Sequence, residues 1–329
     1  MAVLNFLDVA KRLDPQGKVH ALAELLSQTN PILDDMPFVE GNHPTGHRVG
    51  IRTGLTTVYW RLVNQGVQPS KSTSAQIDEQ TGMLEAWSEV DKDLAELNGN
   101  TAEFRLSEAK AFLEAMNQEA AQTIFYGNSG TSPEEFNGLA IRFSSTAAAN
   151  GQNIILAGGA GSDNASIYLV GWSPEKVFGI YPKGSKAGLM HEDLGLVTVE
   201  TTAGVGGSRM RAYQDHFQWK MGLCVKDWRY VVRGANIDIS NLVANSGSQA
   251  DLINLMIKMC HRLPNGGQGC KPVFYMNRSV FQMLDIQRRD DVVAGGINYE
   301  TVDGKIVPHF RGFPIKVTDA LLDSESAIA

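Results

Sequence analysis

Residues 46 to about 93 have the pattern of one unusually long β-hairpin, and this feature constrains the fold most. Residues 49–63 and 76–90 are rich in β-branched and aromatic side chains, and the polar, turn-rich residues 64–74 separate them. Arms of roughly 15 residues would extend on the order of 50 Å, whereas a usual strand has about 5–6 residues. An isolated ribbon of two strands is marginally stable in water and leaves both edges unpaired.

The first arm of this hairpin does not alternate cleanly between apolar and polar residues. Ile51 and Tyr59 fall on one face of the arm, and Val58 and Trp60 fall on the other. A ribbon with apolar side chains on both faces needs protein on both sides, and a second copy of the same chain can supply it. The alternative is a long hairpin that packs on its own domain.

Length and composition set the broad class. The 329 residues are enough for two or three domains with a sizeable core. The net charge of −7 and the pI near 5.5 argue against a surface built to grip nucleic acid, which is usually basic. No apolar run approaches the roughly 18 residues that a membrane span requires. The odd number of cysteines, without C-x-x-C spacing, predicts reduced thiols in a protein made in a cytosol.

The chain begins with two predicted amphipathic helices, residues 3–13 and 19–28. Leu22, Leu25 and Leu26 recur at helical spacing in the second helix. The two helices are too short to form a core of their own, so we predict an N-terminal arm with an apolar stripe.

The clearest helix is predicted at residues 107–126. Ser107 is a good N-cap, and Gly127 stands just after the end. The helix carries an apolar stripe at helical spacing, formed by Phe112, Leu113, Met116, Ala120 and Ile124.

From residue 165 the pattern changes to strands separated by glycine and proline. The predicted strands are residues 167–172, 177–181, 196–201, 210–226 and 230–238. A helix at 248–263, a strand at 273–276 and a helix at 278–287 follow, and residues 299–317 alternate around two turns. Because helices and strands mix without βαβ alternation, the predicted fold class is α+β.

The sequence shows no recognisable catalytic string, and we expect no enzyme activity, no cofactor and no metal. His43 and His47 are four residues apart, but Pro44 prevents the helix that would align them on a metal. Cys260 falls on the apolar stripe of its predicted helix, which indicates a small buried side chain. Residues 191–193, His-Glu-Asp, are predicted to form a solvated turn.

The order of these elements resembles that of the HK97-fold major capsid proteins of tailed bacteriophages. The family has an N-arm, a long hairpin called the E-loop, a spine helix with the P-domain, and the A-domain. Four short strings carry the resemblance, and the last of them is similar to capsid proteins of short-tailed phages: F-N-G-L at 136–139, F-Y-M-N-R at 274–278, F-R-G-F-P-I at 310–315 and R-Y-V-V-R-G-A-N at 229–236.

The resemblance implies the following domains. They are the N-arm at 1–35, the E-loop hairpin at 36–97, the P-domain with its spine helix at 98–162 and 191–233, and the A-domain at 163–190 and 234–329. The helix–strand–helix unit at 248–287 follows the β-rich block here, whereas it precedes that block in the family. We therefore expect the same shape with its strands connected in a different order.

The resemblance also implies a structural function. The chain would self-assemble into hexamers and pentamers of an icosahedral shell that encloses double-stranded DNA, located in the virion and assembled in the host cytoplasm. Two alternatives stay open: an encapsulin-type compartment shell, which shares the fold, and a β-rich hydrolase. The expected contacts between subunits are Tyr59, Trp60, Leu62, Lys71, Met83 and Trp87 of the E-loop and Leu22, Leu25 and Leu26 of the N-arm.

The expected partners follow from the same resemblance. They are other copies of the chain, a separate scaffolding protein, a portal, a cement protein where one is present, and packaged DNA bound without sequence specificity. No membrane is expected.

Overall fold

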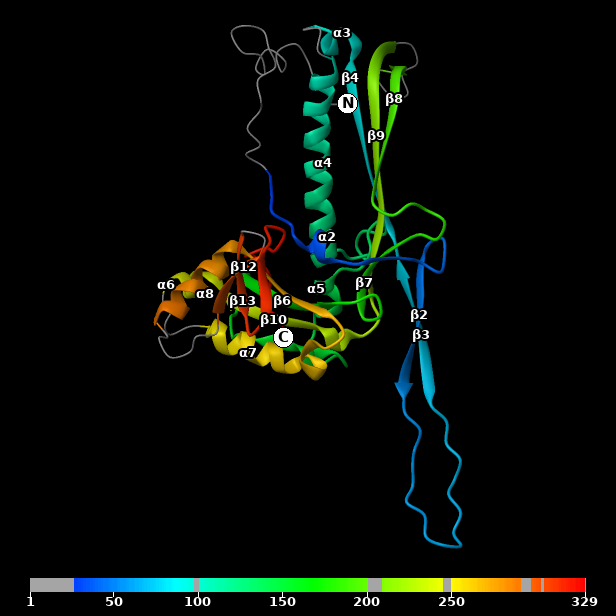
Figure 1. The fold of residues 1–329 in the computed structure, drawn as a ribbon, viewed down its shortest axis with the longest axis vertical. Coiled ribbons are helices and arrows are strands. Elements are labelled where there is room, and N and C mark those ends of the chain that lie inside the picture. Colours follow the sequence, from blue (N-terminus) through cyan, green and yellow to red (C-terminus); the bar gives the residue numbers. More distant parts are fainter. Residues whose placement is uncertain are drawn as a thin grey trace.

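The computed structural model describes residues 27–97, 101–200, 209–244, 250–290, 297–302 and 305–328. Three parts meet near the middle of the molecule (Figure 1). A long helix and three long strands extend in one direction, a two-stranded hairpin extends in the opposite direction, and a sheet with its helices lies to one side. The predicted N-arm residues Leu22, Leu25 and Leu26 fall outside the described residues.

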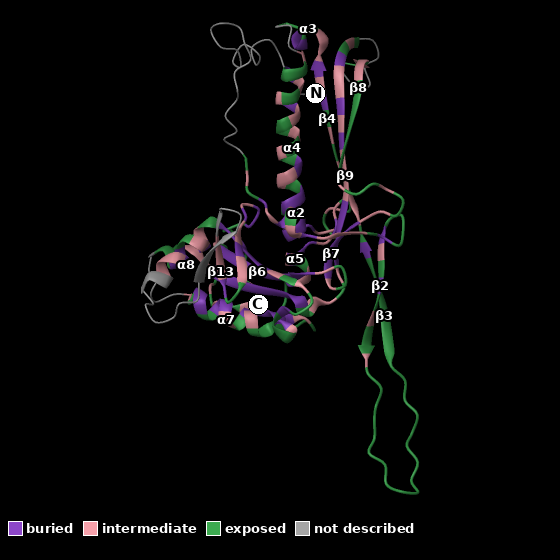
Figure 2. Ribbon diagram, in the orientation of Figure 1, coloured by how far each residue is buried: buried purple, intermediate pink, exposed green. Residues whose placement is uncertain are grey.

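The larger sheet has seven strands around a fully buried centre. Its order is β12 (Ile297–Val302), β13 (Lys305–Phe310), β14 (Phe313–Val317), β11 (Lys271–Met276), β6 (Asn164–Trp172), β10 (Val231–Asp238) and β5 (Ile154–Leu156). Every residue of β6 is buried, and β6 runs antiparallel to both β10 and β11. Most of the hydrophobic core gathers on these central strands (Figure 2).

The helices beside the seven-stranded sheet are α6 (Ile239–Ala244), α7 (Leu252–Arg262) and α8 (Arg278–Asp290). The predicted stripe of α7 is confirmed, because Leu252, Leu255, Met256 and Met259 are all buried. Asp251 caps the helix by accepting a hydrogen bond from the Asn254 N–H at 2.8 Å, so the helix begins later than predicted. Cys260 is only half-buried, at the edge of the core.

The second sheet is built around the 17-residue strand β9 (Arg209–Val225). β9 pairs along one edge with β4 (Gly82–Asp91) and along the other with β8 (Leu189–Glu200) and β7 (Val177–Tyr181). β1 (Phe38–Glu40) adds a parallel strand beside β7. Short helices α2 (Ile32–Asp35) and α5 (Leu139–Arg142) lie near the joint where the three parts meet, and α3 (Lys92–Ala95) lies at the outer end of β4 and α4 (Thr101–Tyr126) (Figure 1).

The long helix α4 spans Thr101–Tyr126 and lies along this second sheet. It begins before Ser107, so the predicted N-cap is wrong, but the predicted end is confirmed. Gly127 is required there because a Cβ atom would lie 2.4 Å from the Phe136 carbonyl oxygen. Of the predicted stripe, the half near the joint is buried (Met116, Ala120, Ile124), whereas Leu113 is exposed, because the outer half packs only on a narrow ribbon.

Two sequence predictions about β-structure are wrong. The hairpin pairs β2 (Gly46–Gly54) only with β3 (Thr73–Gln80), and residues 55–72 form its tip without regular secondary structure. After Thr81 the chain enters β4, which pairs with β9 rather than with the first arm. Residues 191–193 lie within β8 rather than in a solvated turn.

Candidate intersubunit surface

The tip of the hairpin, residues 55–72, is exposed at every position (Figure 2). It carries a cluster of large apolar side chains. Trp60 is fully exposed, at 105 % of its reference area. A cluster of large apolar side chains that is exposed in one place usually marks an interaction surface. The apolar side chains of the tip are Leu55, Val58, Tyr59, Trp60, Leu62, Val63 and Val67.

The charged side chains of the hairpin are all basic over a stretch of the sequence that includes the tip. Residues 41–77 contain Arg48, Arg52, Arg61 and Lys71 and no aspartate or glutamate. The predicted contact residues Tyr59, Trp60, Leu62 and Lys71 all belong to the tip, and all are exposed. The tip therefore offers an apolar and cationic surface.

The root of the hairpin is held by a bidentate ion pair. Arg142 of α5 donates from Nη1 and Nη2 to the two carboxylate oxygens of Glu79, each at 2.6 Å. The Glu79 side chain is 6 % exposed, and the same guanidinium also donates to the carbonyl oxygens of Asn137 and Leu223. Gly46 completes the root, because a Cβ atom there would lie 2.0 Å from the Glu79 carbonyl oxygen. The hairpin is thus fixed to the body at its base.

Met83 and Trp87 lie on β4 and not on the hairpin, which corrects their expected position. Phe217 of β9 stacks on Phe112 of α4 and is paired with Ala86, so these two sheet residues face the helix. The neighbouring position, Trp87, therefore points to the opposite face of the sheet.

On this outer face Trp87 stacks on His216, with ring centroids 4.1 Å apart. Met83, Glu85 and Glu89 occupy alternate positions of β4 and share the same face. Glu192 of β8 is paired with His216 across the strands and lies there too. The outer face is apolar at its centre and is surrounded by these glutamates and by Lys220, the partner of Met83 across the strands.

We expect the Trp87→Ala variant to lower the stability of the isolated subunit by about 1–2 kcal/mol, because it removes the stack on His216 and part of the apolar surface of the sheet. Chemical unfolding of the unassembled subunit measures this change. Met83→Ala is the control, because Met83 lies on the same face but has no ring contact. It should lower the free energy of unfolding by less than Trp87→Ala does. An unchanged unfolding midpoint for Trp87→Ala would contradict the packing described here.

A polar network joins α4 to the other face of the sheet. Arg105 Nη2 donates to Asp215 Oδ1 at 2.9 Å and to Asp193 Oδ1 at 2.6 Å. His191 Nε2 lies 2.9 Å from Asp215 Oδ1, and its ring stacks on Phe217. The hydrogen bond from Arg105 lowers the pKa of Asp193 below its ordinary value. The network connects three elements that extend from the body, and nothing in the sequence pattern of residues 191–193 indicated it.

A second charged group is buried inside the seven-stranded sheet. Arg233 Nη2 donates to Glu325 Oε2 at 2.8 Å, and both side chains are less than one-tenth exposed. Tyr126 donates to the other carboxylate oxygen, and Ser166 donates to Oε2. Burial and the neighbouring carboxylate raise the pKa of Tyr126 far above its usual value. This cluster ties the last residues of the chain to the end of α4.

Burial raises the pKa of the Cys224 thiol to about 12 and that of Cys260 to about 11, so both thiols are neutral at physiological pH. Within the described ranges, no three His, Cys, Asp or Glu side chains come together to hold a metal, and no helix is long and apolar enough to span a membrane.

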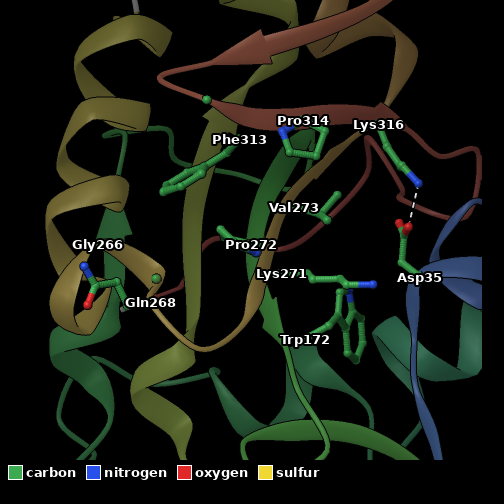
Figure 3. Close-up of a pocket in the computed structure, with 12 residues that line it drawn as sticks. Asp35, Trp172, Gly266, Gln268, Lys271, Pro272, Val273, Phe313, Pro314 and Lys316 are labelled. Atoms are coloured by element: carbon green, nitrogen blue, oxygen red, sulfur yellow. Dashed lines mark hydrogen bonds and ion pairs between the residues drawn. The ribbon is translucent and has the colours of Figure 1, made fainter. Parts of the chain in front are cut away.

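A cavity of about 490 Å³ opens at the edge of the seven-stranded sheet (Figure 3). Its only carboxylate, Asp35, accepts from Lys316 Nζ at 2.5 Å and from the Tyr275 hydroxyl at 2.7 Å. Trp172 Nε1 in turn donates to the Tyr275 oxygen at 2.8 Å. These bonds join α2 to the sheet and pair the Asp35 carboxylate with Lys316 at the wall of the cavity.

Comparison with known proteins identifies the family. The model of the family "Major capsid protein GP7" matches residues 14–329. A chain in the near-atomic cryo-EM structure of bacteriophage epsilon15 is 31 % identical, with a TM-score of 0.79 over 100 % of this chain and 98 % of that chain. This match confirms the expected phage capsid fold. No curated protein matches the sequence.

Two more distant structures are too dissimilar to support an argument. The capsid of a native GTA particle is 11 % identical, with a TM-score of 0.47 over 68 % of this chain and 95 % of that chain. An encapsulin complex from Synechococcus elongatus is 10 % identical, with a TM-score of 0.46 over 72 % of this chain and 97 % of that chain. The chain belongs to the GP7 family of major capsid proteins and is a structural protein of a bacteriophage capsid.

Proposed function

We propose that the chain forms the homo-hexamers and homo-pentamers of an icosahedral shell around a double-stranded DNA genome, and that the hairpin of each subunit lies on its neighbour. In this proposal the seven-stranded sheet is the A-domain, and the five-stranded sheet with α4 is the P-domain. The observation that carries it is the hairpin tip, whose apolar side chains have no cover within the described part of the subunit.

The direction of the hairpin supports a contact between subunits. It extends opposite to α4, β4, β8 and β9 (Figure 1), and the Glu79–Arg142 pair fixes its root. The tip therefore does not reach the exposed sheet face of its own chain. A contact between the tip of one copy and a different surface of the next is heterologous, and such contacts close into rings when the rotation allows it.

The remaining partners belong to the same proposal. We place assembly in the host cytoplasm, with a separate scaffolding protein and a portal, and with a cement protein where one is present. The net charge of −7 supports DNA packing without tight binding, because strong phosphate binding needs many lysines and arginines.

The Trp60→Ala variant tests the proposal. We expect an unchanged unfolding midpoint for the isolated subunit, because Trp60 has no packing to lose, and a clear loss of closed particles in electron micrographs. Deletion of residues 65–73 should have the same effect on assembly, and Gln65→Ala, a polar change in the tip, is the control. A destabilised subunit that still assembles normally would overturn the proposal.

A further inference from the structure

A small cavity lies where β4 leaves the root of the hairpin. Its volume is about 200 Å³, and it is bounded by β4, α4 and residues 134–136. Its walls are mainly apolar: Gly82, Met83, Leu84, Ala120, Phe136 and Met221. For comparison, an apolar cavity of about 150 Å³ in another protein admits benzene. The cavity therefore has room for one aromatic ring.

Three glutamates line the same cavity, namely Glu119, Glu134 and Glu135. Glu119 and Glu134 are exposed, and neither pairs with a cation in the part of the chain that the structure describes. Glu135 accepts a hydrogen bond from the Asn128 N–H at 3.3 Å. The matching occupant is an aromatic side chain with a cation beside it.

The hairpin tip presents this combination in two consecutive residues. Trp60 is fully exposed, and Arg61 follows it. Trp and Arg are also the side chains that most often dominate the energy of a protein interface when they fill a pocket. Strand geometry places Trp60 on the order of 40 Å from the root, so its own cavity is out of reach.

We propose that Trp60 of one copy inserts into the cavity beside β4 of a second copy, and that Arg61 pairs with the glutamates at the rim. This inference rests on the proposed function and adds the receiving site. The apolar walls remove the indole from water, and the carboxylates select a cationic tip over a neutral one. The contact is heterologous, because the tip and the cavity are different surfaces of the same chain.

Site-specific photo-cross-linking tests the receiving site. Trp60 is replaced by p-benzoylphenylalanine, and particles assembled from a mixture of isotope-labelled and unlabelled subunits are irradiated, digested and mapped by mass spectrometry. We expect mixed-label cross-links to Leu84, Phe136 or Met221. Mixed-label cross-links to another surface would overturn this inference but keep the hairpin as an intersubunit element. Cross-links within one chain only, or none in closed particles, would overturn the proposed function as well.

Charge exchange gives an independent test. Arg61→Glu should raise the subunit concentration needed for assembly by about tenfold, because like charges then meet at the rim. Combining it with Glu134→Arg should recover most of the loss. Lys71→Glu combined with Glu134→Arg is the matched control and should show no recovery. Equal behaviour of the two combinations would overturn the pairing of Arg61 with the rim.

Discussion

The Glu325→Gln variant should lose about 3–5 kcal/mol of folding free energy, because it leaves the buried guanidinium of Arg233 without its counter-charge. Glutamine keeps the shape of the side chain, but it removes the charge and also replaces one of the two acceptor oxygens, to which Tyr126, Ser166 and Arg233 donate, by a donor. Arg233 keeps its hydrogen bonds to the carbonyl oxygens of Ala140 and Phe143, but these carry no net charge. Urea unfolding of the isolated subunit measures the loss.

An exposed ion pair of the same chain is the control. Glu200 lies 3.7 Å from Arg209, and both side chains are largely exposed, so Glu200→Gln should leave the unfolding midpoint nearly unchanged. Replacing both buried partners, Arg233→Met with Glu325→Leu, should recover part of the stability, because no uncompensated charge then remains. If Glu325→Gln behaves like the surface control, the cluster does not stabilise the fold as described.

Local patterns in the sequence predicted the helices and strands well where the structure of an element depends only on its own stretch of chain. The stripe of α7 is one example, since its apolar spacing and the burial of Leu252 and Met259 depend on one face of one helix. Strand β7 likewise matches its predicted bounds, Val177–Tyr181. The predicted stripe of α4 failed at Leu113, because burial there depends on which sheet residues lie opposite.

The pairing of strands was not readable from the sequence. Residues 82–91 have the composition of a strand, but composition does not specify whether the partner is β2 or the distant β9. The partner is defined by the register of the folded chain, in which Ser88 pairs with Asp215 and Val90 with Tyr213 of β9. For this reason the sequence pattern predicts Trp87 on the hairpin.

The buried charges were missed for a related reason. Glu79 and Arg142 are 63 residues apart, and Arg233 and Glu325 are 92 apart, so no local motif links either pair. One signal was present, because Arg233 interrupts the apolar run V-V-R-G-A within a predicted strand. Arginine is almost never fully buried without a partner, so this position predicts a buried acidic partner, although not which one.

The Arg142→Met variant should lower the stability of the subunit by about 2–4 kcal/mol, because Glu79 would keep a buried charge without a partner and the carbonyl oxygens of Asn137 and Leu223 would lose a donor. Arg142→Lys should recover only part of this loss, since an ammonium group does not make the bidentate contact. Chemical unfolding measures both changes.

The same variant also tests whether the hairpin is set in place before assembly. If the Glu79–Arg142 pair fixes the root, amide hydrogen exchange in β2 and β3 of the isolated subunit should become faster in Arg142→Met. Arg48→Gln is the matched control, because Arg48 pairs with Asp78 on the exposed surface of the same hairpin and its loss should leave the root intact. Equal acceleration in both variants would mean that the ribbon itself, and not its root, limits the exchange. Unchanged exchange in Arg142→Met would mean that the ion pair does not hold the hairpin, and the fixed direction on which the contact between subunits depends would need another origin.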